Sequence, residues 1–401
     1  MIGRIFLVIL VLGLCCVELV RGSESKSLVS DNTAFALDLY NELKDTEDNL
    51  FFSPYSVSTC LAMTYAGARG ETETQMARIL HFTQKQAIHN SFEQLQHDLN
   101  AVQKANSNEL NIANALWAQK GHPFIPAFLT VATQQYGAML KQVDFKDPSN
   151  RVDAVLNINQ WVAKKTKDRI ENIISSEDLD ELVRLILVNA IYFKGTWAKP
   201  FDTNATAIEP FHFTRKEDVQ VPLMHHFQSV NYEENDEFQA VELPYQGGAI
   251  SMVILLPRQI DGRKQLETSL NSANLALWLA KMRKREVDVY IPRFKLESRF
   301  SLAGHLAKMG MADAFSNRAD FSGMDSTKNL FISEVFHKAW VEVDERGTEA
   351  AAATAAVMME KAELQAQPPV FRADHPFIFL IRDTRSGTVL FLGRLIKPTE
   401  F

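Results

Sequence analysis

The sequence predicts an α+β fold, in which helices and strands follow one another without the regular strand–helix–strand alternation of parallel-sheet proteins. Helix-like spacing of apolar residues dominates the first half of the chain, and alternating apolar residues mark strands in the second half. Two nearly continuous apolar runs near the C-terminus are typical of fully buried strands. No repeat, low-complexity block or proline- and glycine-rich linker divides the chain, so we expect one domain over residues 23–401.

Residues 1–22 have the features of a secretory signal peptide. Arg4 precedes an apolar run from Ile5 to Val17, and Val20-Arg21-Gly22 offers a cleavage point. The run is shorter than the roughly 20 residues that span a bilayer, which makes a membrane anchor the weaker alternative. A lipoprotein signal at Cys15 or Cys16 is disfavoured by the bulky preceding leucine. We therefore expect a secreted, extracellular protein without membrane attachment after the signal is removed.

The mature chain would keep a single cysteine, Cys60, and so could form no internal disulfide. Cys60 stands in an apolar stretch, which favours a small core residue over a reactive thiol. Asn204-Ala205-Thr206 is an acceptor for N-glycosylation. The net charge of −7, with both signs mixed along the chain, provides no overall field for nucleic acid and argues against a nucleic-acid partner.

Two helices stand out in the first half. Asp31 or Asn32 could cap a helix with a regularly spaced apolar face, and a second helix is indicated before a group of lysines. The apolar positions are Ala36, Leu39, Tyr40 and Leu43 in the first helix and Val155, Ile158 and Val162 in the second, which Lys164, Lys165 and Lys167 follow.

Four strands stand out in the second half. Alternation marks two of them, one after the turn at residues 246–248 and one before Pro292. The alternating positions are Ile250, Met252 and Ile254 in the first and Val287, Val289 and Ile291 in the second. The two C-terminal apolar runs are Phe377 to Ile381 and Val389 to Leu392.

One segment departs from these patterns. From Gly347 to Met359 the residues are small, and neither a large apolar anchor nor a proline interrupts them. Propensity alone favours a helix or an alanine-rich linker. The alternation of Glu342, Val343 and Asp344 just before it is strand-like, and small side chains could join a sheet without clashes. Both interpretations stay open on physical grounds.

Several stretches resemble motifs of one family. They are Phe52-Ser53-Pro54-Tyr55-Ser56, residues 67–72 (GARGET), residues 189–197 (NAIYFKGTW) with Pro200-Phe201, residues 371–379 (FRADHPFIF) and Phe391-Leu392-Gly393-Arg394. Each is moderately specific, and together they span the mature chain in the family's order. The chain thus resembles the serpins, which trap serine proteases and are not enzymes.

The resemblance implies a fold of three β-sheets with about eight or nine helices and an exposed reactive-centre loop, here about residues 345–369. In this family the native form is metastable: the protease cleaves the loop and forms an acyl-enzyme, and the loop then inserts into the central sheet. The matching hinge residues are Glu345, Arg346, Gly347, Thr348, Ala350 and Ala352, of which Arg346 departs from the commonest acidic residue. An inserted strand would turn Thr348 and alternate alanines inward, and none of these is charged.

The resemblance also assigns structural roles. Trp197 would lie at the breach, where the loop first inserts, and Ser53, Ser56, Asn189 and His337 would form the shutter, a polar cluster beneath the strands that separate. Without the resemblance, His337 would be interpreted as an ordinary core histidine and Trp197 as core packing.

Counting from Glu345 at family spacing places the scissile bond at Lys361-Ala362. A lysine before the bond suits a trypsin-like protease, which has an acidic specificity pocket. Glu360 and Glu363 flank the bond, and a slip of the loop register would present Met359-Glu360 or Leu364-Gln365 to chymotrypsin-like or elastase-like enzymes instead.

Other chemistry has little support in the sequence. No zinc-protease, phosphate-loop or nucleophile-elbow motif occurs, and we expect neither metal nor organic cofactor. His225 and His226 are neighbours in a strand and would point to opposite faces. Lys281, Arg283, Lys284 and Arg285 could bind a heparin-like polyanion, although a solvated helix end is the commoner explanation. The runner-up function is a non-inhibitory serpin, a carrier, chaperone or storage protein, and we expect a monomer.

Overall fold

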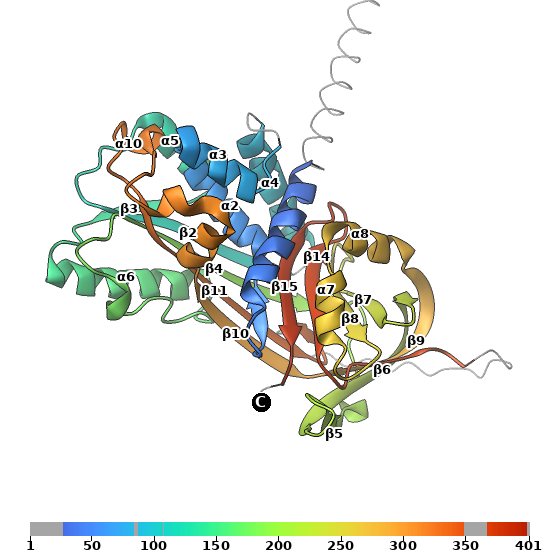
Figure 1. The fold of residues 1–401 in the computed structure, drawn as a ribbon. Helices are drawn as coiled ribbons and strands as arrows, with labels where there is room; N and C mark the ends of the chain where they lie inside the picture. Colours follow the sequence, from blue (N-terminus) through green and yellow to red (C-terminus); the bar gives the residue numbers. More distant parts are fainter. Residues whose placement is uncertain (1–26, 84–86, 107, 349–366, 399–401) are drawn as a thin grey trace, which may run out of the picture.

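The computed structural model describes residues 27–83, 87–106, 108–348 and 367–398. Its strands form two hydrogen-bonded sheets, and helices cover both. In Figure 1 the long curved strands of one sheet cross the molecule, with α6 on one side of them and α2, α3 and α4 gathered on the other. The predicted signal peptide lies outside the described residues.

The six-stranded sheet carries the candidate site. Its order is β10 (Phe294–Ser301), β11 (Ile332–Asp344), β12 (Gly347–Thr348), β4 (Leu185–Thr196), β2 (Glu109–Gln119) and β3 (Met139–Val143). Five of these are full strands, whereas β12 has two residues only. Below β12, β11 and β4 pair directly and in parallel.

Side chains of β4 alternate between two separate apolar clusters. Ile186, Val188 and Ala190 face the smaller cluster, which α6 (Pro148–Lys165) covers with Ala154, Ile158 and Val162. Leu185, Leu187 and Ile191 face the main core. This strand is buried on both faces, which explains why it has no apolar–polar alternation in the sequence.

The nine-stranded sheet combines two of the three sheets that the sequence predicts. One group contains β1 (Leu50–Phe52), β15 (Val389–Leu395), β14 (Phe377–Asp383), β8 (Ile250–Pro257) and β7 (Phe238–Pro244). The other contains β9 (Arg283–Pro292), β13 (Val370–Arg372) and β5 (Ala207–Phe211). The long strand β6 (Val219–Glu234) pairs with β7 at one end and with β9 along most of its length, so it joins the groups. All four strands predicted in the second half are confirmed.

The helices comprise one over residues 27–43 and then α2 (Pro54–Tyr65), α3 (Gly70–Ile79), α4 (Ile88–Asn106), α5 (Pro126–Thr130), α6, α7 (Arg263–Ser269), α8 (Ser272–Lys281), α9 (Ala303–Leu306) and α10 (Ser322–Asp325). Every residue of α2 is buried, because it lies between the two sheets. In Figure 1, α7 and α8 lie over the strands β7 and β8.

The first helix begins earlier than predicted, because Asp31 and Asn32 lie inside it and cap nothing. Both side chains are buried and contact other segments: Asn32 accepts a hydrogen bond from Ser58, and Asp31 accepts from Thr83. Short polar side chains mimic a cap signal in the sequence when they in fact join two parts of the core. The predicted apolar face, from Ala36 to Leu43, is buried as expected.

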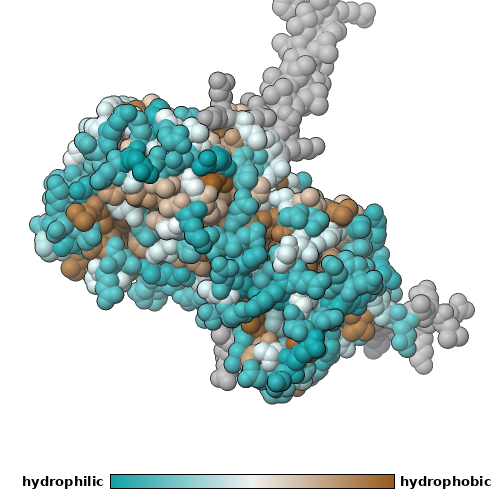
Figure 2. Space-filling model, viewed as in Figure 1, coloured by the Kyte–Doolittle hydropathy of each residue, from teal (hydrophilic) through white to brown (hydrophobic). Residues whose placement is uncertain are grey.

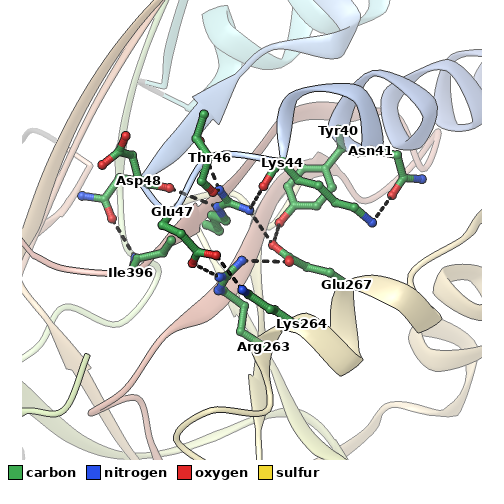
Figure 3. Close-up of polar contacts among 12 residues, drawn as sticks. Tyr40, Asn41, Lys44, Thr46, Glu47, Asp48, Arg263, Lys264, Glu267 and Ile396 are labelled. Atoms are coloured by element: carbon green, nitrogen blue, oxygen red, sulfur yellow. Dashed lines mark hydrogen bonds and ion pairs between the residues drawn. The ribbon is translucent and has the colours of Figure 1, made fainter. Parts of the chain in front are cut away.

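Arg394 explains one of the sequence motifs. Its side chain is fully buried and donates hydrogen bonds to Lys44 O at 2.8 Å, to Asp48 O at 3.1 Å and to Glu267 Oε1 at 2.9 Å. Glu267 also accepts from Tyr40 at 2.8 Å, and the surrounding group is drawn in Figure 3. The cluster ties the first helix and the following turn to α7 and β15, and its complete pairing compensates for burying the charges.

Cys60 is fully buried in α2, as predicted, and burial raises the pKa of its thiol to about 12. The face shown in Figure 2 is mostly hydrophilic, with scattered apolar patches. Among the residues that the structure describes, none forms a helix with the length and apolar character needed to cross a membrane.

Candidate functional site

The candidate site lies where the direct pairing between β11 and β4 ends and the two strands separate. Ile332 to Trp340 of β11 pair directly with Leu185 to Tyr192 of β4. Beyond this point the strands separate, and β12 occupies the space, pairing with Val343 and Asp344 on one side and with Gly195 and Thr196 on the other. The first residues of the predicted hinge therefore already form a short central strand.

Gly347 fits this place because it has no side chain. Its φ of +148° lies in a region that other residues rarely adopt, and a Cβ there would lie 2.0 Å from Gly195 O and 2.7 Å from Thr196 Cα. Gly195 is constrained in turn, because a Cβ on it would lie 2.7 Å from the Phe193 ring and 2.8 Å from the Tyr245 ring. The two glycines let three strands approach closely at this point.

Thr348 points into the main core, as the predicted inward set requires. It is fully buried, and its hydroxyl lies 2.8 Å from the hydroxyl of Tyr245. Burial raises the pKa of Tyr245, so this phenol stays protonated. The ring of Tyr245 stacks on Trp197 at 4.5 Å between centroids. Trp197 Nε1 donates to Asp344 O at 3.0 Å, which places Trp197 beside the predicted hinge.

Glu345 is held by an ion pair. Arg293 binds its carboxylate through two nitrogens, with Nε to Oε2 at 2.8 Å, and Thr206 donates to Oε1 at 2.5 Å. Burial opposes ionisation of Glu345, but the contacts with Arg293 and Thr206 outweigh it and lower the pKa. The neighbouring residue, Arg346, contributes a backbone contact: its carbonyl oxygen accepts a hydrogen bond from Trp197 N at 2.8 Å. The base of the loop is thus fixed to the body of the protein.

Four residues that the sequence assigned to the shutter meet beneath the β11–β4 pair. His337 Nδ1 lies 2.5 Å from Asn189 Oδ1, and Asn189 Nδ2 donates to Ser56 Oγ at 2.6 Å. Ser53 N donates to His337 Nε2 at 3.0 Å, and Ser53 Oγ also caps α2 by accepting from Ser56 N. The cluster connects β11, β4 and α2.

These contacts fix the protonation of His337. Because Nε2 accepts from Ser53 N–H, the ring proton must be on Nδ1, which donates to Asn189 Oδ1. The side chain is fully buried, and burial lowers its pKa to about 3. A second proton would face the Ser53 N–H, so the cluster requires neutral histidine.

The sequence analysis missed Arg293 and Thr206, which hold Glu345, and two further members of the site. Asn114 of β2 accepts from Asn189 Nδ2 at 2.5 Å and extends the shutter to a third strand. Tyr245, at the end of β7, completes the breach. A lone asparagine or tyrosine carries no signal in one sequence, because its partners lie far away along the chain.

Other predicted residues are placed as follows. Asn204 is exposed in a short turn that Asp202 caps. The four members of the basic group are all exposed: Lys281 ends α8, and the other three lie on β9, where Arg283 donates to Ala280 O at 2.6 Å and Arg285 lies 3.5 Å from Glu234. Ala350, Ala352, Lys361 and Ala362 and the alternative scissile bonds lie outside the described residues.

His225 and His226 take separate partners, as neighbours in a strand do: His225 pairs with Asp288, and His226 contacts the Phe201 ring edge-on. In the part of the chain that the structure describes, no three histidine, cysteine or acidic side chains gather where they could hold a metal ion.

Comparison with known proteins shows which family, relatives and solved structures the chain is similar to. Residues 30–398 match the family described as serpin (serine protease inhibitor). Leukocyte elastase inhibitor of Sus scrofa is 42% identical over 383 residues, covering 93% of this chain and 100% of that protein. The structure of human thyroxine-binding globulin in complex with thyroxine matches with a TM-score of 0.84 and 31% identity over 94% of this chain and 100% of that one. Serpin48 of the insect Tenebrio molitor matches with a TM-score of 0.82 and 32% identity, covering 94% and 99%.

Proposed function

The chain belongs to the serpin family, and we propose that it is a secreted inhibitor that traps a serine protease irreversibly when the protease cleaves its reactive-centre loop. Relatives such as the leukocyte elastase inhibitor of Sus scrofa are protease inhibitors by name. In the proposed reaction the protease provides the chemistry: its serine forms the acyl-enzyme, and this chain provides the cleaved loop and a sheet that accepts it. It would act as a monomer without metal or cofactor.

The observation that carries this proposal is the position of β12. Gly347 and Thr348 pair with both β11 and β4, at the point above which the loop continues. If the loop lengthened β12 into a full strand, it would need room between β11 and β4. These two strands would have to separate along Ile332 to Trp340 by one strand spacing, about 4.8 Å. The shutter contacts between His337, Asn189 and Ser53 bridge this line and would have to rearrange.

The alternative is a carrier without inhibitory activity. Human thyroxine-binding globulin shares the fold and is named for the ligand it binds. The hinge argues for inhibition here, since Thr348 is small enough to be buried completely and its hydroxyl has a partner. A large or charged residue at this position would oppose insertion, because the buried group would lack a partner.

Specificity and location complete the proposal. The Lys361-Ala362 bond favours a trypsin-like target, while the names of the relatives point to elastase for those proteins. Residues 1–22 favour secretion. Binding of a heparin-like polyanion would use the exposed basic group of Lys281, Arg283, Lys284 and Arg285. The rate of inhibition, measured with and without heparin in the wild type and in Lys284→Ala, tests this part.

A complex that survives denaturant tests the main proposal. The protein is incubated with trypsin, and a covalent band on a denaturing gel is expected, whereas cleavage without a complex would favour the carrier. Thr348→Arg should convert the inhibitor into a substrate, because a charge cannot be buried where Thr348 lies: the start of the loop is kept out of the sheet, insertion slows, and the acyl-enzyme hydrolyses first. Thr348→Val, which matches the shape of threonine, is the control and should still trap trypsin. Full trapping by Thr348→Arg would show that the hinge assignment is wrong.

A further inference from the structure

A cavity of about 250 Å³ lies on the flank of the six-stranded sheet, away from the hinge. Its floor is apolar and consists of Tyr55, Leu99 and Leu110, all buried. Its upper walls are mostly polar: Gln96 and Asn100 come from α4, Asn111 and Ile112 from β2, and Lys165 from the end of α6. The cavity is smaller than the usual sites of drug-sized ligands and has a mostly polar wall, so it suits a ligand of only a few heavy atoms that carries polar groups.

The cavity exists because two neighbouring strands differ in length. β3 pairs with β2 from Ala115 to Gln119 only. Residues 109–114 of β2 extend past the end of β3, so that on this side β2 has no neighbouring strand within the described ranges. The helices α4 and α6 flank this free stretch, and the space between them is the cavity.

Two groups in the walls favour a negatively charged ligand. Lys165 is exposed and supplies a positive charge, while none of the described lining residues is acidic. Asn111 Nδ2 is buried and has no hydrogen-bond partner among the described residues. A buried donor without a partner is costly, and the broad torsional preference of an asparagine amide allows it to turn toward a ligand. The neighbouring carboxylate of Glu109 is paired with Lys167 and does not line the cavity.

We propose that this cavity binds a small oxyanion, a phosphate or a dicarboxylate, between Lys165 and Asn111. The ammonium group of Lys165 neutralises the ligand, and the amides of Asn111, Gln96 and Asn100 donate hydrogen bonds to its oxygens. The ligand adds a connection between α4, β2 and α6 across the cavity. Binding to the folded chain alone therefore raises the temperature at which the protein unfolds.

The test uses inorganic phosphate and succinate as probes at constant ionic strength, with glycerol as a neutral probe. Binding is followed by ³¹P line broadening for phosphate, by saturation-transfer proton NMR for succinate, and by the unfolding midpoint for all three. We expect saturable binding with a dissociation constant of about 1 mM for at least one anion and none for glycerol. Binding of phosphate alone or of succinate alone identifies the headgroup, and binding of both shows that charge decides.

Matched variants locate the site. Lys165→Gln should weaken binding at least tenfold, whereas Lys164→Gln, which removes the adjacent exposed lysine outside the cavity, should not. Asn111→Asp keeps the shape of the side chain and should abolish binding, because its carboxylate repels the anion and pairs with Lys165. The proposal is overturned if neither anion binds at a concentration about tenfold above the expected dissociation constant. It is also overturned if Lys165→Gln binds as the wild type does, or if both lysine variants lose binding equally. None of these results depends on protease inhibition.

Discussion

The hydroxyl groups of Tyr245 and Thr348 lie 2.8 Å apart in a fully buried contact that joins the end of β7 to the hinge. Among the described residues, no other pair of side-chain hydroxyls links the hinge to the main core. Removing either hydroxyl leaves the other buried without its partner, which costs about 1–3 kcal/mol.

We therefore expect Tyr245→Phe and Thr348→Val each to lower the thermal unfolding midpoint. The double variant should lose less than the sum of the two, with a coupling energy of about 1 kcal/mol, because it contains no orphaned group. Unfolding is followed by circular dichroism at one fixed scan rate, since the midpoint of an irreversible transition depends on the scan rate. Additive losses would show that the two hydroxyls do not interact.

Gly347→Ala should displace the hinge from the sheet. The new Cβ would lie 2.0 Å from Gly195 O, and the φ of +148° would be strained by about 1–3 kcal/mol in alanine. We expect a lower unfolding midpoint and faster hydrogen exchange in peptides that cover residues 340–348. Gly304→Ala in α9 is the control, because its Cβ would meet nothing within 4 Å. Unchanged exchange in Gly347→Ala would contradict the pairing of β12.

The pH dependence of stability should report on His337. Its pKa is about 3 in the folded chain and about 6.5 when unfolded. Between these values the unfolded chain binds a proton that the folded chain does not, so stability is complete above about pH 6.5 and falls as the pH decreases toward 3. His89, whose pKa burial lowers to about 4, contributes with the same sign.

One full proton corresponds to a slope of about 1.4 kcal/mol per pH unit. His337→Asn keeps an N–H donor toward Asn189 and removes the titrating group, so it should flatten the decline between pH 6 and 4 by up to that amount. Urea midpoints at half-unit steps measure the effect. His97→Gln, at an exposed position, should keep the slope of the wild type. A parallel decline in His337→Asn and the wild type would place the titrating group elsewhere.

The sequence predicted strands whose residues alternate in polarity or form short apolar runs between turns, and it missed others, among them β2 and β4. β8 and β9 were recognised from alternate apolar positions, and β14 and β15 from short, nearly continuous apolar runs. β2 and β4 separate two apolar clusters, and neither has an alternating pattern. Asp31 was mistaken for a cap because a buried polar contact and a cap use the same residue types.

The site was predicted from the family resemblance rather than from local chemistry. Ser53, Asn189 and His337 are far apart along the chain, and nothing in their spacing shows that they meet. Trp197 was predicted beside the hinge, but Tyr245, which stacks on it, and Arg293, which pairs with Glu345, were not, because contacts between strands leave no trace in a single sequence. The stacking of Tyr245 on Trp197 and the Arg293–Glu345 pair could be found only in three dimensions.

The target bond is the last prediction. From Thr348, which is fixed in β12, an extended chain to Lys361 would span roughly 45 Å at about 3.3 Å per residue. A loop cleaved after Lys361 would therefore reach along the whole β11–β4 line when inserted. We expect trypsin to release a C-terminal peptide from the denatured complex that begins at Ala362, as mass spectrometry would show. Lys361→Ala should slow trypsin inhibition at least tenfold, because the acidic pocket loses its partner. Lys216→Ala removes an exposed lysine in the turn between β5 and β6 and is the control for nonspecific loss of charge. A peptide that begins at Glu360 or Gln365 would overturn both the bond and the trypsin-like class, and would instead assign the loop to chymotrypsin-like or elastase-like enzymes.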